Sequence, residues 1–204
     1  MFITEIKEIT KTKYIIYIDC EVAFALYKGE CKKYNIKVGE EISEEIYQVI
    51  MNDILLKRAK LRSMNLLKSR DYTEYQLSDK LKKGYYPQNI IDKAIEYVKE
   101  YGYVDDIRYA ENFIKYAKEN KSKKQIETLL IQKGISKENI RSAFENSSEN
   151  YDDIQEEELI KKLLLKKNYN FSMSSVKEQQ KIIAFLYRKG FSLDKIYKVV
   201  EQID

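Results

Sequence analysis

The first 27 residues alternate short apolar and polar runs, and the rest of the chain does not. β-Branched and aromatic residues dominate positions 14–18 and 22–27, with polar breaks before each run. This pattern predicts a small antiparallel sheet over residues 2–27. Residues 28–38 are expected to form a short helix or a turn. After Gly39 the apolar period becomes that of a helix, with Ser43 as the expected N-cap.

Beyond residue 52 the same arrangement of helices occurs three times. Each copy has a leading helix, a short helix and a final amphipathic helix with apolar residues at i, i+3, i+4 and i+7. The apolar stripes of the final helices are Ile91, Ala94, Ile95 and Val98, then Ile140, Ala143 and Phe144, then Ile196, Val199, Val200 and Ile203. Such spacing predicts three tandem three-helix repeats.

A Lys-Gly pair separates the short helix from the final helix in each copy. The glycines are Gly84, Gly134 and Gly190, and the first copy aligns with the others only with one extra residue before Pro87. Each glycine fits the left-handed position that follows a helix. The apolar residues three places before the glycines are Leu81, Ile131 and Tyr187, and the expected N-caps with capping boxes are Thr73, Ser122 and Ser175.

These patterns predict a mostly α protein, in which three tandem three-helix repeats form an elongated curved solenoid after a β-rich N-terminal segment. The expected segments are residues 1–52 for the β-rich part and 53–104, 105–150 and 151–204 for the repeats. Residues 146–150 are the expected flexible joint between the second and third repeats.

The composition excludes much chemistry. The 204 residues include no His, six Gly, one Pro and two Cys. Mechanisms that need imidazole are therefore absent, and Cys20 and Cys31 are too few for a zinc site or a disulfide framework. No Gly-rich phosphate loop, signal peptide or membrane span is found. We expect a cytoplasmic monomer that is not an enzyme and has no cofactor.

Two acidic runs have a simple structural interpretation. Asp105 and Asp106 open a predicted helix, where carboxylates cap the first turn and suit the helix dipole. The run at residues 156–158 is expected to be a solvated helix end that suits the helix dipole. Neither run indicates a catalytic or metal site.

Three stretches resemble the RecX family. Residues 69–77 (SRDYTEYQL) with 80–85 (KLKKGY) are similar to its first-repeat signature, 102–110 (GYVDDIRYA) to its junction motif, and 129–135 (LLIQKGI) to its second-repeat helix. The family often has Gly where this chain has Ser122. The resemblance implies a regulator that lodges in the groove of the RecA–single-stranded DNA filament and restrains its ATPase, strand-exchange and co-protease functions.

Basic clusters are the candidate binding groups. Net charge is +4, and residues 53–104 carry 11 basic and 7 acidic side chains. The candidates for contact with RecA or DNA are Arg58, Arg62, Arg70, Lys82, Lys83, Arg108, Lys115, Lys118, Lys121, Lys123, Lys124, Arg188 and Lys189. Solvated lysine-rich helix faces are the simpler interpretation of any single cluster.

The tyrosines also have a structural and a functional interpretation. Most of the 18 tyrosines are expected to pack against the core, while Tyr72, Tyr75, Tyr85, Tyr86 and Tyr116 are the better candidates for base stacking.

Two functional hypotheses remain open. The first is a regulator that binds the RecA filament and contacts single-stranded DNA, weakly when the DNA is alone. The second is a general single-stranded nucleic-acid-binding repeat module that makes no contact with a recombinase.

Overall fold

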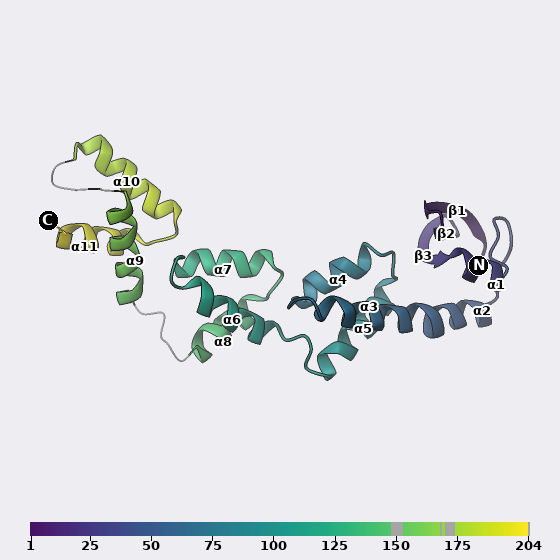
Figure 1. Cartoon of the computed structure of the whole chain (residues 1–204). Helices are drawn as coiled ribbons and strands as arrows, with labels where there is room; N and C mark the ends of the chain where they lie inside the picture. Colours follow the sequence, from purple (N-terminus) through teal and green to yellow (C-terminus); the bar gives the residue numbers. More distant parts are fainter. Residues whose placement is uncertain (148–152, 168, 170–173, 204) are drawn as a thin grey trace. The chain divides into compact units, whose positions relative to one another are not determined.

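The computed structural model describes residues 1–147, 153–167, 169 and 174–203. The chain forms two compact units, Met1–Asp105 (unit 1) and Asp106–Asp204 (unit 2), shown along the colour scale of Figure 1. Within the described residues the structure is mostly helical, with one small sheet at the N-terminus. No helix among the described residues is both long and apolar enough to cross a membrane.

The predicted sheet is present as an antiparallel meander in unit 1. Its strands are β1 (Ile3–Thr10), β2 (Lys13–Ile18) and β3 (Glu21–Tyr27), in that order. Asp19 and Cys20 both have positive φ in the turn between β2 and β3. A two-residue turn of this kind matches the twist of the strands that it joins.

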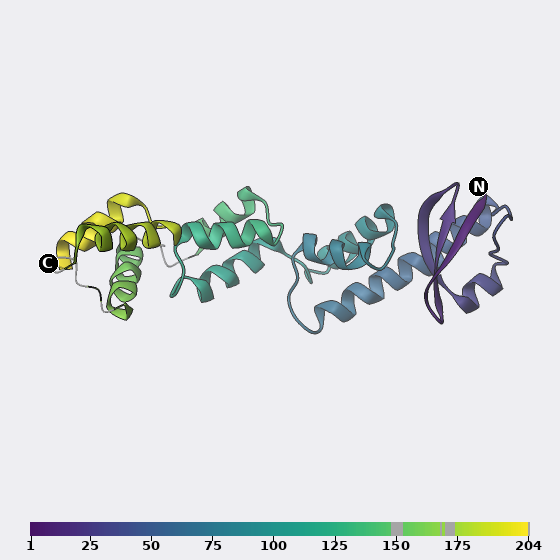
Figure 2. The same ribbon diagram turned by 90° about the horizontal axis from the view of Figure 1, so that it is seen from above.

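A continuous helical segment follows the sheet. After α1 (Lys28–Lys33), the helices α2 (Glu44–Val49), η1 (Ile50–Leu56, with π-helical bonding) and α3 (Lys57–Leu67) succeed one another without a break. Figures 1 and 2 show this long helix running past the sheet into the first repeat. Ser43 caps α2, as predicted, by accepting a hydrogen bond from the Ile46 N–H at 3.4 Å. The boundary expected after residue 52 falls inside this helix.

The sheet and the first repeat share one hydrophobic core. The repeat is completed by α4 (Glu74–Lys82) and α5 (Gln88–Glu100). The common cluster joins side chains of the sheet to those of η1, α3, α4 and α5, among them Ile16, Phe24, Leu55, Leu81 and Ile91. Because one face of the sheet is buried by these helices, the N-terminal segment and the first repeat form a single unit.

Unit 2 contains the other two sets of three helices. They are α6 (Asp106–Ala117), α7 (Lys123–Gln132) and α8 (Lys137–Asn146), then α9 (Asp153–Lys166), α10 (Val176–Arg188) and α11 (Leu193–Ile203). α6 packs on α8, α9 packs on α11, and each set has its own buried cluster. Of the expected joint at residues 146–150, positions 148–150 lie outside the described residues.

The prediction of a left-handed glycine after each short helix is confirmed in two repeats and wrong in the first. Gly134 and Gly190 have φ of 85° and 89°. In the first repeat Tyr85, and not Gly84, takes the left-handed conformation, with φ of 63°. Gly84 is needed for a different reason, because a Cβ there would lie 2.9 Å from the Tyr86 ring.

With Tyr85 aligned on the two glycines, the three helix ends match without a gap. In each, the left-handed residue donates to the carbonyl three residues earlier, and the next residue donates to the carbonyl five residues earlier. These pairs are Tyr85 to Lys82 and Tyr86 to Leu81, Gly134 to Ile131 and Ile135 to Leu130, and Gly190 to Tyr187 and Phe191 to Leu186. The extra residue that the sequence alignment placed before Pro87 is therefore unnecessary.

The same register shows which residues of the short helices fill the core. Leu81 is fully buried, whereas Ile131 and Tyr187, which also stand three places before a glycine, are 46% and 55% exposed. Leu130 and Leu186, one residue earlier, fill the core instead. Leu81, Leu130 and Leu186 each stand four places before the left-handed residue that ends the helix.

The expected hydroxyl caps begin their helices. Thr73 forms a capping box with Gln76, and Ser122 accepts a hydrogen bond from the Gln125 N–H at 3.2 Å. Glu178 accepts from the Ser175 hydroxyl at 2.7 Å and from the Ser175 N–H at 2.9 Å. These hydrogen bonds from Ser175 hold the pKa of the Glu178 carboxyl below its ordinary value.

Candidate functional site

Two basic segments that the sequence analysis treated separately lie together in unit 2. The Ser122 hydroxyl, at the start of α7, donates to the Lys189 carbonyl at the end of α10, over 2.6 Å. A Cβ on Gly190 would lie 3.1 Å from the Lys124 Cβ. We call the basic residues around this contact the α7–α10 cluster: Lys121, Lys123, Lys124, Arg188 and Lys189.

Three of the five basic side chains in this cluster are exposed to solvent. Lys123, Lys124 and Arg188 are exposed, and Lys189 is half-buried. The Lys123 ammonium lies 5.0 Å from the centre of the Phe144 ring. An ammonium over an aromatic face is held in place while it still faces water. The cluster can therefore attract phosphate oxygens or carboxylates of a partner.

A buried carboxylate holds the second and third repeats together beside this cluster. Glu156 on α9 is 5% exposed. One of its oxygens accepts from the Lys123 backbone N–H at 2.9 Å, and the other from the Lys195 ammonium at 2.8 Å. Because a carboxylate at the start of α7 also suits the helix dipole, Glu156 fixes the position of that helix relative to α9 and α11.

The expectation of a solvated acidic end at residues 156–158 is therefore wrong for two of its three residues. Glu156 is buried, and Glu157 pairs with Lys198 on α11 at 2.6 Å. Only Glu158 is exposed. The partners lie 33 to 41 residues away in the chain, so no local pattern signals them.

The other predicted residues of unit 2 belong to α6 or its end. Lys115 is exposed in the last turn of α6, and Lys118, just after that helix, is half-buried. Arg108 lies in the first turn, about 10 Å from Lys115 along the helix axis. Arg108 is thus at the opposite end of α6 from Lys115 and Lys118.

In unit 1, Arg58 is engaged within the protein. Its guanidinium pairs with Glu30 on α1, donates to the Ala25 carbonyl at 3.3 Å, and lies 4.7 Å from the centre of the Tyr27 ring. The other oxygen of Glu30 accepts from the Tyr27 backbone N–H at 2.7 Å. Arg58 therefore ties α3 to the end of the sheet.

Two further cations lie near Arg58. Arg62 is exposed one turn later on α3, and Lys13 on β2 donates to the Gly84 carbonyl at 3.2 Å. Burial lowers the pKa of Lys13, and the positive charges of Arg62 and Arg58 lower it further, while Glu30 opposes them. Lys13, Arg58 and Arg62 form what we call the sheet–helix cluster. Sequence reasoning missed Lys13 because it stands alone in a strand.

The remaining predicted residues of unit 1 lie at helix ends. Arg70 follows α3 and its guanidinium lies 4.4 Å from the centre of the Tyr72 ring. Lys82 and Lys83 are exposed at the end of α4. Lys83 pairs with Asp79 at 2.7 Å, and this hydrogen bond raises the pKa of its ammonium.

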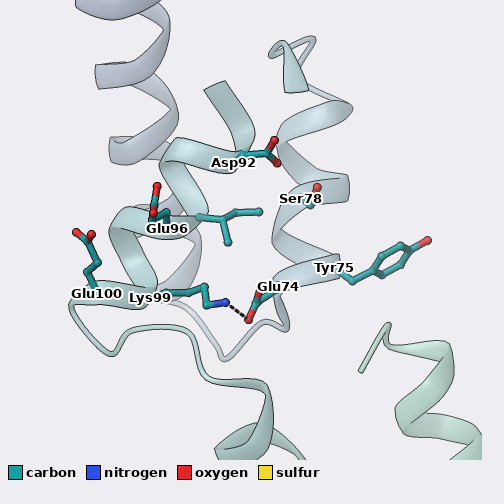
Figure 3. Close-up of a pocket in the computed structure, with 8 residues that line it drawn as sticks. Glu74, Tyr75, Ser78, Asp92, Glu96, Lys99 and Glu100 are labelled. Carbon is teal, nitrogen blue, oxygen red and sulfur yellow. Dashed lines mark ion pairs between the residues drawn. The ribbon is translucent and has the colours of Figure 1, made fainter. Parts of the chain in front are cut away.

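An open groove between α4 and α5 has the opposite charge (Figure 3). Its lining carries four carboxylates, and the single lysine, Lys99, pairs with Glu74 at 2.7 Å. Figure 3 shows the Tyr75 ring pointing away from this ion pair. A phosphate would be repelled there, so this groove is not the nucleic-acid-binding candidate.

Metal-ligating groups do not assemble in the part of the chain that the structure describes. No set of three or more His, Cys, Asp or Glu residues there is placed to hold a metal ion. Asp106 is the first residue of α6 and is buried, in agreement with its expected place in a first turn.

Comparisons with known proteins also find similarity to RecX proteins. The family model for the first three-helix domain of RecX matches residues 59–97, and the model for the third matches residues 155–200. The chain is 34% identical to "Regulatory protein RecX" of Caldanaerobacter subterraneus subsp. tengcongensis over 98% of both chains. It is 32% identical to the protein of the same name from Clostridioides difficile, over 92% of this chain and 88% of that one.

Solved structures agree with this fold. A crystal structure of regulatory protein RecX is similar with a TM-score of 0.66 and 25% identity, covering 98% of each chain. The structure of RecX from Lactobacillus salivarius has a TM-score of 0.61 at 24% identity and covers 74% of this chain and 97% of that one. The second likeness concerns the fold alone.

Proposed function

This chain belongs to the RecX family of regulatory proteins, and we propose that it is a non-enzymatic regulator of the RecA–single-stranded DNA filament. In this role it restrains the ATPase, strand-exchange and co-protease functions of RecA, and so regulates recombination and DNA repair. Its partners are RecA and the single strand within the filament. It acts as a monomer and shares the cytoplasm with RecA.

The observation that carries this proposal is the α7–α10 cluster. Basic side chains of the second and third repeats meet at one surface, and the Glu156 and Ser122 contacts hold the two repeats in place. A rigid basic surface loses little conformational entropy when it binds an anionic partner. A nucleoprotein filament presents such a partner through its phosphates and acidic side chains.

The proposal is tested by the rate of ATP hydrolysis by RecA on single-stranded DNA. Wild-type protein at substoichiometric concentration should slow hydrolysis. Reversal of three exposed charges in the cluster (Lys123→Glu, Lys124→Glu and Arg188→Glu) should raise the concentration needed for half-maximal effect about tenfold or more, through charge repulsion.

A matched triple variant controls for net charge. Lys137→Glu, Lys162→Glu and Lys177→Glu also reverse exposed lysines of unit 2, but these residues lie outside the cluster. This variant should stay within about threefold of the wild type. Absence of any effect of wild-type protein at saturation would overturn the regulatory function. Equal loss in both variants would remove the cluster from the site but leave the function.

A general single-stranded nucleic-acid-binding module is the second candidate, favoured by the same basic surface. Such a module would bind a naked oligonucleotide tightly and lose affinity steeply with salt, by roughly one unit of log–log slope per phosphate contacted. A filament regulator should instead be captured far better by RecA on DNA than by either component alone. A single pull-down with the three baits separates the two.

A further inference from the structure

Three tyrosine rings lie in contact at the end of α5 in unit 1, and we call them the tyrosine ladder. The ring centres of Tyr97 and Tyr101 are 4.9 Å apart. Those of Tyr101 and Tyr103 are 6.1 Å apart, and these two rings are within 15° of parallel. Tyr101 and Tyr103 are 60% and 51% exposed. Large rings that share an exposed surface are typical of places where proteins bind a partner.

The backbone brings these rings together. Tyr97 and Tyr101 are four residues apart on α5 and therefore share one face of the helix. The helix then ends at Gly102, which is left-handed with φ of 68°. The next N–H, that of Tyr103, donates back to the Val98 carbonyl at 2.9 Å. This turn folds the chain against the end of α5 and places the third ring beside the second.

A cation of the protein itself already lies on the first ring of the ladder. The Lys60 ammonium on α3 is 4.2 Å from the centre of the Tyr97 ring. The negative face of an aromatic ring attracts a cation at this distance. Within the described residues, no cation lies over Tyr101 or Tyr103. The two exposed rings therefore offer the same kind of contact to a cation from another molecule.

Exposed carboxylates border the ladder on α5. Glu96 and Glu100 are both exposed, and Glu100 is three residues after Tyr97, so the two are neighbours on the helix surface. In the described part of the chain, neither glutamate forms an ion pair. Figure 3 shows the Glu100 carboxylate pointing away from the ion pair between Lys99 and Glu74. Glu100 is also the last residue of α5, where the helix dipole disfavours a negative charge, so helix stability does not explain its position.

An arginine side chain of a partner protein fits this surface better than a phosphate or a lysine does. A guanidinium is planar, so it can stack on a tyrosine ring while it donates two hydrogen bonds to a carboxylate. An ammonium is a point charge and lacks the flat face. A nucleic-acid strand could use the rings, but its phosphates would meet the repulsion of Glu96 and Glu100.

We propose that the tyrosine ladder and the glutamates beside it form a docking surface for an arginine-bearing segment of a partner protein. The guanidinium stacks on the ring of Tyr101 or Tyr103 and pairs with the Glu100 carboxylate. This inference goes beyond the proposed regulation of the filament. The α7–α10 cluster of unit 2 attracts anions, whereas this surface of unit 1 takes a cationic segment.

The first test compares two short fluorescent peptides, one alternating glycine with arginine and the other glycine with lysine. Binding to the full-length protein is measured by anisotropy, without RecA or DNA. The two peptides carry the same charge, so general attraction to acidic surfaces affects them equally. The arginine peptide should bind about fivefold more tightly, because only a guanidinium can stack and pair at once. Equal affinity for the two peptides would overturn the proposal.

The second test removes the exposed rings of the ladder. The double variant Tyr101→Ser, Tyr103→Ser should bind the arginine peptide about fivefold more weakly and lose the preference for arginine over lysine. The control, Tyr116→Ser with Tyr187→Ser, removes two tyrosines of unit 2 that are 78% and 55% exposed. It should stay within about twofold of the wild type, since surface substitutions away from a site have small effects. Equal losses in the two double variants would count against the ladder as the site.

Glu100→Gln tests the carboxylate and keeps the proposal falsifiable if the tyrosine variant does not fold. The side chain is exposed, and loss of its charge at the end of α5 should leave the thermal midpoint unchanged or slightly higher. Affinity for the arginine peptide should fall about threefold, with a weaker dependence on salt. Glu158→Gln, an exposed glutamate of unit 2, is the matched control and should bind like the wild type. An unchanged affinity in the Glu100 variant would also overturn the proposal.

Two further measurements separate other occupants of the surface. Affinity for a fluorescent oligothymidine should be the same in the wild type and in the Tyr101→Ser, Tyr103→Ser variant. A loss for the oligonucleotide without a loss for the arginine peptide would assign the rings to bases and overturn the proposal. Sedimentation velocity should show the same oligomeric state for both proteins, and a dimer lost in the variant would assign the surface to a second copy of the chain. None of these measurements involves RecA, so failure here leaves the filament proposal to its own test.

Discussion

The helix ends of the first and third repeats use the same backbone hydrogen bonds but face different surroundings. At the third, Gly190 packs on the start of α7, where a Cβ would lie 2.6 Å from the Ser122 hydroxyl. At the first, Tyr85 keeps an exposed ring beside Gly84, whose carbonyl accepts from Lys13. The third end is thus a contact between repeats, and the first is an open surface.

This difference shows that one backbone motif can serve two purposes. Where a neighbouring helix comes close, only hydrogen fits at the left-handed position. Where no helix covers the position, a side chain is sterically possible, and the cost is backbone strain alone. Whether this position holds glycine or a larger residue therefore depends on what packs against the helix end.

Gly190→Ala should give the largest effect. The added methyl group combines strain at φ of 89° with displacement of the Ser122 hydroxyl from the Lys189 carbonyl. We expect a loss of about 3 kcal/mol in the free energy of unfolding, measured by urea denaturation. Gly29→Ala is the control, because a Cβ there meets nothing within 4 Å, and it should be neutral or stabilising by up to about 1 kcal/mol. Similar losses in both variants would contradict the close contact.

Glu156→Ala should weaken the same junction by about 2 kcal/mol. It removes the acceptor of the Lys123 N–H and the hydrogen bond from the Lys195 ammonium to the Glu156 carboxylate. Glu158→Ala, in the same helical turn but exposed, should change the unfolding free energy by about 0.5 kcal/mol or less. Equal midpoints of thermal unfolding for the two variants would show that Glu156 does not hold the repeats together.

Tyr85→Gly should have the smallest effect and the opposite sign. Relief of the left-handed strain exceeds the added flexibility of the unfolded chain, so we expect stabilisation of about 0.5–1 kcal/mol by urea denaturation. Tyr85→Ala removes the same ring but keeps a Cβ, and should not stabilise. If Tyr85→Gly and Tyr85→Ala destabilised the protein equally, the Tyr85 ring would have to pack within unit 1. The comparison with Gly190 would then not hold.

Local patterns in the sequence predicted much of the fold. The sheet, the capping residues Ser43, Thr73 and Ser122, and most of the buried stripes of the final helices agree with the structure. Each depends on neighbours within a few residues, which a linear pattern displays. The alignment of the first repeat failed because Tyr85 occupies a position where the pattern seeks a glycine.

The sequence predicted which residues belong to the candidate site, but it did not predict that they lie together. The basic residues around Ser122 and those before Gly190 were chosen from the sequence, but nothing there joins them across 67 residues. Arg58 looked like its neighbour Arg62 on the helix face, yet only Arg58 pairs with Glu30. Lys13 was not among the residues chosen from the sequence, because the arginines whose charges act on it are more than 40 residues away in the chain.

The sequence by itself determined that this chain has no imidazole, forms a small sheet and helices in sets of three, and resembles the RecX family. These properties follow from composition and from interactions between residues close in the chain. Only the tertiary structure decided which charges are buried, which are paired and which remain free to bind. The energy of a charge depends on its distance to other charges and on its burial, and both are set by residues that are distant along the chain.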